Sequence, residues 1–309
     1  MSEAIAHWDD VPKRRRDNGF LGATWRDLGS AAGSLGIGVT RIEMAAGEIP
    51  TPPHMHQNEE EIFFVLGGSG LSWQDGRTYE IGAGDVLVHP VFGAPHTLRA
   101  GPEGLDVLAF GQRALGQGGY LPRAGIIWAW PGWVEVGAGD APWDREAALG
   151  PPEFPEPEAE RPETIRNLAD VEPLDFWPRE RGVRRRLAPA PLTEFTGLGH
   201  WELEPGQMSA PAHCHSAEEE ICIVLEGSGV LSLGDEEHAV RRGHVVARPP
   251  GSRVAHALRA ADDEGLTYVV YGTRVPDDVA FYPRSNKLFF RGVGVIARIE
   301  PLDYWDGEL

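Results

Sequence analysis

Short apolar runs bounded by turn residues recur along the chain. Residues 62–66, 85–88, 96–99 and 105–110 are rich in β-branched or aromatic side chains and are bounded by Gly, Pro or Asp. Such runs predict β-strands, and no segment of helical period and length competes with them. Short strands at even spacing are typical of closed or two-layered antiparallel barrels. The pattern therefore predicts an all-β protein.

One part of this pattern occurs twice. Residues 45–70 and 204–229 are identical at thirteen of twenty-six positions without a gap. The correspondence continues with an offset that grows from 159 to 161 residues by the pair 110–113 and 271–274, as single insertions in loops would produce. The repeat predicts two tandem barrels related by internal duplication.

The length of 309 residues also suits two domains. Between the copies, Pro and Glu alternate in residues 151–163 so densely that neither helix nor sheet is expected. We expect an N-terminal domain at 1–140, an exposed, acidic, proline-rich linker at 141–167 and a C-terminal domain at 168–309. Residues 172–177 (EPLDFW) and 300–305 (EPLDYW) form a second, smaller repeat, which suits either a flap that crosses to a neighbour or ordinary edge packing.

Histidines and glutamates in the repeat have the spacing of metal ligands. His54 and His56 are two residues apart, which places them on one face of a strand. Glu61 opens the next strand, and His96 follows a later turn. The second copy has the same residue types in the same order: His213, His215, Glu220 and His256.

Duplication separates these histidines from the others. A lone histidine on a half-buried strand is more often a hydrogen-bonded core residue than a ligand. Of the eleven histidines, only these six recur at equivalent positions, whereas the rest have no histidine counterpart and are interpreted as structural or surface residues: His7, His89, His200, His238 and His244. We expect one divalent metal in each domain.

Both copies resemble the cupin superfamily, whose motifs are G-x5-H-x-H-x3,4-E-x6-G and G-x5-P-x-G-x2-H-x3-N. The ligand positions and the spacing from Glu61 to Gly68 match, while the loops before His54 and before His96 or His256 are longer and Ala100 and Ala260 replace the final Asn. The resemblance covers about residues 45–113 and 204–274, and it implies a bicupin of two jelly-roll (double-stranded β-helix) barrels.

The ligand set restricts the metal and the pocket. Three imidazoles and one carboxylate leave about two open positions on an octahedral ion, which suits Fe(II), Mn(II), Ni(II) or Co(II), whereas Zn(II) favours a closed tetrahedral site. Resemblance to cupin dioxygenases favours iron, followed by manganese. Strand parity adds candidate pocket residues, for which an ordinary core role remains the alternative: Phe63, Val65, Leu98, Cys222, Val224 and Leu258.

Charge and segment composition limit the partners. The net charge is −19, and the short Arg-rich runs are flanked by acids, so nucleic acid and anionic membranes are not expected as partners. Two cysteines, no signal peptide and no membrane span lead us to expect a cytoplasmic protein that acts on a small molecule. Whether it forms a homo-oligomer is open.

Three functions fit these features. The first is a metal-dependent dioxygenase, an oxidoreductase that acts on a small organic substrate, with aromatic compounds among the candidates. Phe63 and the tryptophans after the first barrel (Trp128, Trp130 and Trp133) favour the first domain as the substrate pocket. The second is a non-oxidative decarboxylase, lyase or isomerase, since oxalate decarboxylase has a similar bicupin architecture. A small anionic substrate of that class would need arginine in the pocket. Arg99 and Arg259, however, have the opposite strand parity to His96 and His256 and are expected to face outward. The third is a binding cupin without turnover.

Overall fold

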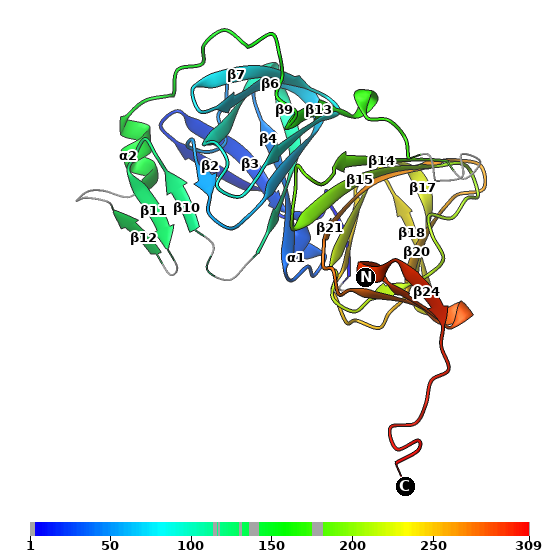
Figure 1. Ribbon diagram of the computed structural model, residues 1–309. Coiled ribbons are helices and arrows are strands. Elements are labelled where there is room, and N and C mark those ends of the chain that lie inside the picture. Colours follow the sequence, from blue (N-terminus) through cyan, green and yellow to red (C-terminus); the bar gives the residue numbers. More distant parts are fainter. Residues whose placement is uncertain are drawn as a thin grey trace.

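Two β-barrels lie side by side in the computed structural model (Figure 1), which describes residues 4–113, 116, 118–129, 132–135, 142–174 and 182–308. Helices in this part of the chain are short, and none is long and apolar enough to cross a membrane. They are Leu28–Ala31 (α1), Pro142–Ala148 (α2) and three 3-10 turns, Leu168–Asp170 (η1), Pro283–Ser285 (η3) and Arg291–Val293 (η4).

The first barrel combines an eight-stranded and a four-stranded sheet. The larger sheet has the order β13-β8-β6-β9-β4-β3-β2, with β7 on β6, and the smaller has the order β12-β11-β10-β5. Their strands are Arg14–Asn18 (β2), Leu21–Asp27 (β3), Ile37–Met44 (β4), Met55–His56 (β5), Glu61–Gln74 (β6), Arg77–Gly82 (β7), Asp85–His89 (β8), His96–Gln112 (β9), Gly118–Leu121 (β10), Ile126–Ala129 (β11), Gly132–Glu135 (β12) and Ile165–Asn167 (β13).

The second barrel repeats this plan. Its larger sheet has the order β1-β19-β17-β21-β15-β14, with β18 and β20 on β17, and its smaller sheet has the order β16-β22-β23-β24. Their strands are Ile5–His7 (β1), Gly182–Ala188 (β14), Thr196–Leu203 (β15), Cys214–His215 (β16), Glu220–Leu233 (β17), Glu236–Arg241 (β18), His244–Arg248 (β19), His256–Ala260 (β20), Leu266–Thr273 (β21), Val279–Tyr282 (β22), Lys287–Phe290 (β23) and Val295–Arg298 (β24). Two tandem jelly-roll barrels, as predicted, account for this all-β architecture.

Strand β9 joins two runs that the sequence predicts as separate strands, 96–99 and 105–110. It is paired with β6 on both sides of residues 101–104, and the register shifts near Gly68. There the φ angle is +79°, and a Cβ atom on Gly68 would lie 2.2 Å from the carbonyl oxygen of Gly104. Glycine therefore allows both strands to bend without separating.

Both faces of the central strands are buried, which explains their continuous apolar runs. In β6, Phe63 and Val65 face the interior of the first barrel, whereas Ile62 and Phe64 belong to a core shared by the two barrels. The second barrel contributes the equivalent strand β17 to this shared core. Phe110 and Tyr271 meet there with their ring centroids 5.1 Å apart. The two barrels therefore share one apolar core.

Each barrel also takes an edge strand from the other half of the chain. Strand β1, at the N-terminus, pairs with β19 of the second barrel, and Ile5 packs in that barrel's interior. Strand β13, which lies after the first barrel's own strands, pairs with β8 and places Ile165 in the interior of the first barrel. The two halves of the chain are therefore connected by backbone hydrogen bonds as well as by the shared apolar core.

The segment expected to be an exposed linker lies against the first barrel. Residues 151–163 form no helix or strand and are mostly exposed. However, the Trp73 indole donates to the carbonyl of Glu153 at 2.9 Å, and the Thr78 hydroxyl donates to that of Pro155 at 2.7 Å. Proline removes backbone donors but leaves these carbonyls available as acceptors, so the segment is bound along β6 and β7.

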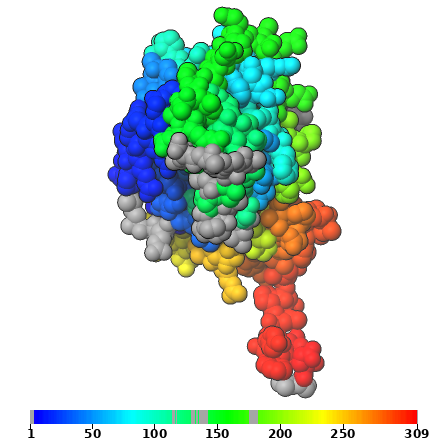
Figure 2. Space-filling view, turned by 90° about the vertical axis from the view of Figure 1, so that its left-hand side faces the viewer, coloured from blue at the N-terminus to red at the C-terminus, as the bar shows by residue number. Residues whose placement is uncertain are grey.

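The smaller repeated segments have different surroundings. The Leu174 backbone N–H donates to the carbonyl of Arg184 at 2.8 Å, so the first copy begins against β14, and residues 175–177 lie outside the described residues. The second copy lies in the C-terminal tail, which stands away from the barrels in both views (Figures 1 and 2). Trp130 and the side chain of Trp133 also lie outside the described part, whereas Trp128 is on β11.

Candidate metal centres

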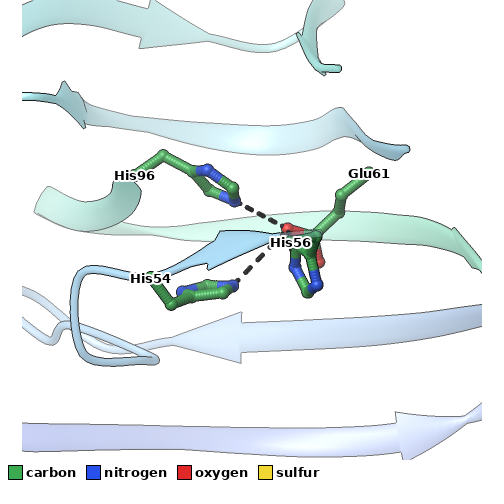
Figure 3. A group of neighbouring side chains, drawn as sticks. All are labelled: His54, His56, Glu61 and His96. Carbon is green, nitrogen blue, oxygen red and sulfur yellow. Dashed lines mark hydrogen bonds and ion pairs between the residues drawn. The ribbon is translucent and has the colours of Figure 1, made fainter. Parts of the chain in front are cut away.

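The four expected ligands of the first barrel converge on one point (Figure 3). Glu61 Oε2 lies 3.7 Å from His54 Nε2, 3.5 Å from His56 Nε2 and 2.8 Å from His96 Nε2. One ligand atom from each of the four residues falls within 4.8 Å of the others. The bridge between His54 and His96 joins the two sheets here, so pairing of β6 with β9 and this bridge position the site.

The second barrel builds the corresponding cluster from equivalent strands. Ligand atoms of His213, His215 and Glu220 fall within 4.8 Å of one another. Glu220 Oε2 lies 3.6 Å from His215 Nε2 and 3.1 Å from His256 Nε2. His256 therefore reaches the cluster through this carboxylate, on the strand position equivalent to that of His96.

Hydrogen bonds at the outer nitrogen set the orientation of the rings. Nδ1 of His54 donates to the carbonyl of Pro52 at 2.9 Å, and Nδ1 of His213 donates to that of Pro211 at 2.8 Å. Nδ1 of His96 donates to the carbonyl of Ala94 at 3.2 Å. Because a carbonyl only accepts, Nδ1 carries the proton in these rings and the Nε2 lone pair points to the centre.

The donor set fits a divalent cation. Nε2 of His56 and Nε2 of His215 are buried and have no hydrogen-bond partner among the described residues. Burial disfavours the charged form of Glu61, but the adjacent imidazoles of His54, His56 and His96 outweigh this effect and hold the pKa of this carboxyl well below its usual range. An ionised carboxylate beside several imidazole nitrogens suits a borderline or hard divalent ion.

The two centres differ in the carboxylate that supports the middle histidine. In the first barrel, Glu59 Oε2 lies 3.2 Å from Nδ1 of His56. In the second barrel, Asp278 accepts a 2.7 Å hydrogen bond from Nδ1 of His215. Asp278 also accepts from the backbone N–H groups of Ala217 and Glu218, at 2.9 and 3.1 Å. The sequence motifs do not single out Asp278, because it lies far along the chain, before β22.

A second difference concerns the residue opposite the ligand glutamate. His89 pairs with Glu61 in the sheet, is 4% exposed, and stacks on His96 with ring centroids 3.6 Å apart. Arg248 pairs with Glu220 in the same position and is 6% exposed. Opposed residues in an antiparallel pair share one face of the sheet, so both side chains lie beside a centre. The sequence motifs do not point to Arg248, and His89 was expected to be only a structural or surface residue.

The six expected pocket residues face the barrel interiors. They belong to the two interior cores, and none is more than 6% exposed: Phe63, Val65 and Leu98 in the first barrel, and Cys222, Val224 and Leu258 in the second. Both cysteines are free, and burial raises the pKa of the Cys222 thiol, which keeps it protonated. Arg99 and Arg259 lie at the outside, against Phe154 and Asp262.

Comparison with known proteins agrees with the repeat. The cupin domain model matches residues 40–109 and 199–272. Oxalate decarboxylase from Bacillus subtilis superposes with a TM-score of 0.59 at 16% identity, covering 90% of this chain and 79% of the other. The formate complex of oxalate decarboxylase from Lactobacillus farciminis gives 0.60 at 16% identity, covering 89% and 87%. No curated protein matches the sequence.

Proposed function

We propose that this bicupin is a metal-dependent enzyme that acts on a small organic molecule without net oxidation, as a decarboxylase, lyase or isomerase. The observation that carries the proposal is the presence of converging histidine and glutamate side chains in both barrels. Likeness to oxalate decarboxylases over most of the chain favours the non-oxidative class over the dioxygenase that we first expected.

The proposed ligands are His54, His56, Glu61 and His96 in one barrel and His213, His215, Glu220 and His256 in the other. A bound divalent ion would act as a Lewis acid toward a carboxylate or carbonyl oxygen. Mn(II), Fe(II), Co(II) and Ni(II) suit the mixed donor set better than Zn(II). The chain itself orients the imidazoles through their Nδ1 atoms, and Phe63 and His89 pack beside His96 and exclude water from that side.

A dioxygenase remains the second candidate because the interior of the first barrel is apolar. Phe63, Val65 and Leu98 line it together with other aliphatic side chains. Such a wall suits an aromatic or aliphatic substrate that shares the metal with O2.

Elemental analysis and gas exchange test the proposal. Protein purified with Mn(II) or Fe(II) should hold two metal ions per chain, and His96→Ala and His256→Ala should each lose one. We expect turnover within a panel of small carboxylates with product release and no stoichiometric uptake of O2. Uptake of one O2 per substrate would establish the dioxygenase instead, and a metal-free protein would overturn both.

A further inference from the structure

The interiors of the two barrels differ in charge although their strands are equivalent. A row of paired residues crosses the interior face of each larger sheet. In the first barrel this row is apolar and consists of Trp25, Ile42, Val107 and Val65. In the second barrel the equivalent row is Arg184, Trp201, Tyr268 and Val224. The first row continues at the sheet edge to Arg14, which is exposed, so only the second row contains a partly buried cation.

Arg248 adds a second cation to the interior of the second barrel. Its Nη2 donates to the carbonyl of Val254 at 2.8 Å and to the hydroxyl of Ser252 at 3.2 Å. Its Nε is buried without a hydrogen-bond partner, and no carboxylate lies within ion-pair distance of the guanidinium among the described residues. The position opposite the ligand Glu220 therefore holds a buried, uncompensated guanidinium.

Arg184 is uncompensated in the same way. Its guanidinium carbon lies 4.2 Å from the centroid of the Trp201 ring, and within the described ranges it has no ion-pair partner. Several other arginines of the barrels are paired with carboxylates: Arg26 with Glu43, Arg41 with Asp106, Arg161 with Asp85, Arg185 with Glu202, and Arg291 with Glu218. Leaving a cation unpaired away from water is costly, so the buried Arg248, with the partly buried Arg184 in the same barrel, indicates a site for an anion.

The surroundings of a bound metal reinforce this difference. In the first barrel, the ligand glutamate and Glu59 would balance the charge of a divalent ion. In the second barrel, the ligand glutamate and Asp278 would do the same, and Arg248 and Arg184 would remain as excess positive charge. An arginine fork beside a metal with open positions is suited to a carboxylate, which binds both through its two oxygens.

We propose that the second barrel binds the carboxylate group of a small organic acid, with Arg248 as its anchoring residue beside the metal, and that the first barrel lacks this specificity. This inference rests on the proposed function, because it assigns the substrate of that function to the second barrel. It reverses our expectation that the first domain holds the substrate.

Cobalt(II)-loaded full-length protein tests the inference without turnover, because the visible absorption of bound cobalt reports on a new ligand. Acetate is the probe, and acetamide is its neutral control. We expect acetate to bind His96→Ala protein, in which the second centre is intact, roughly tenfold or more tighter than His256→Ala protein. Acetamide should bind neither form measurably.

Variants at Arg248 complete the experiment. Arg248→Met should weaken acetate binding roughly tenfold or more, Arg248→Lys should weaken it less, and Arg259→Met, at the surface, should leave it unchanged. Acetate affinity that is unaltered in Arg248→Met, or that belongs to the first centre, would overturn the inference. If Arg248→Met does not fold or bind cobalt, wild-type affinity in Arg248→Lys would overturn it. Arg248-dependent binding without turnover of any substrate would overturn only the proposed function.

Discussion

Consecutive glutamates in each repeat point to different places. Glu61 and Glu220 face the candidate centres, as strand parity predicts. Glu60 instead accepts hydrogen bonds from the backbone N–H groups of Phe195 and Thr196 in the second barrel, at 3.2 and 2.9 Å. The equivalent residue of the second repeat, Glu219, accepts hydrogen bonds from the backbone N–H groups of Leu35 and Gly36 in the first barrel. In each repeat, one glutamate is therefore a candidate metal ligand, and the glutamate before it connects the two barrels.

Asp278 is expected to control metal affinity in the second barrel only. Asp278→Asn keeps an oxygen for the backbone donors but removes the charge that supports His215. In a His96→Ala background, we expect metal affinity to fall roughly 10- to 100-fold, as measured by titration with a competing chelator. Asp262→Asn, at the surface, should have no effect. An unchanged affinity in Asp278→Asn would contradict the assignment.

His200 should make the protein less stable in mild acid. Burial lowers its pKa to about 4, whereas the unfolded chain has the ordinary value of about 6.5. Between these values the unfolded state binds the proton more strongly, so stability is present above pH ~6.5 and is lost as pH falls toward ~4. The contribution is on the order of 2 kcal/mol. Denaturant titrations should show that the free energy of unfolding depends less steeply on pH in His200→Gln than in the wild type. The same pH dependence in both proteins would refute this.

At the scale of elements, the exchange of edge strands makes the stability of each barrel depend on a segment from the other half of the chain. Strand β1 completes the second barrel, and β13 completes the first. Residues 5–11 (IAHWDDV) and 165–171 (IRNLADV) share Ile, Asp and Val at equivalent positions, so the exchanged strands are themselves part of the duplication. Each edge strand covers a buried strand whose backbone groups would otherwise lack partners.

Hydrogen exchange can test this crossed dependence. Ile5→Asp places a charge in the interior of the second barrel, so exchange should increase roughly tenfold or more in β19 and change little in β8. Ile165→Asp should have the opposite pattern, because β13 pairs with β8. Effects confined to each variant's neighbours in the sequence would show that the strands are not exchanged.

At the scale of the whole molecule, the shared apolar core leads us to expect that the two barrels unfold as one unit. Strands β6 and β8 contribute Ile62, Phe64 and Val88, and β17 contributes Ile221 and Ile223 from the other side. These side chains are at most 4% exposed. A barrel without its neighbour would expose this surface to water, at about 25 cal/mol for each Å² of apolar area.

A single substitution in this core should therefore destabilise both barrels together. Phe110→Ala removes the ring that meets Tyr271 and should lower the free energy of unfolding by about 3–5 kcal/mol. Calorimetry should show one transition at a lower temperature, with the calorimetric and van't Hoff enthalpies equal. Tyr304→Ala, in the exposed tail, should leave it unchanged. Two separate transitions in either variant would contradict a single unit.

The sequence by itself determined the duplication, the strand pattern and the sets of histidines and glutamates that meet. These follow from local periodicity, because residues two apart on a strand share a face, and from the recurrence of the same residue types in both copies. The same periodicity placed Phe63 and Cys222 in the barrel interiors, where the structure also has them.

Only the tertiary structure decided which distant residues stand beside those side chains. Arg248 lies opposite Glu220 because of the register between β17 and β19, and Asp278 reaches His215 from the loop before β22. The same holds for the pairing of β1 and β13 with the opposite barrels. Pairing between strands depends on packing and hydrogen bonds across the whole fold, which periodicity along one strand does not encode.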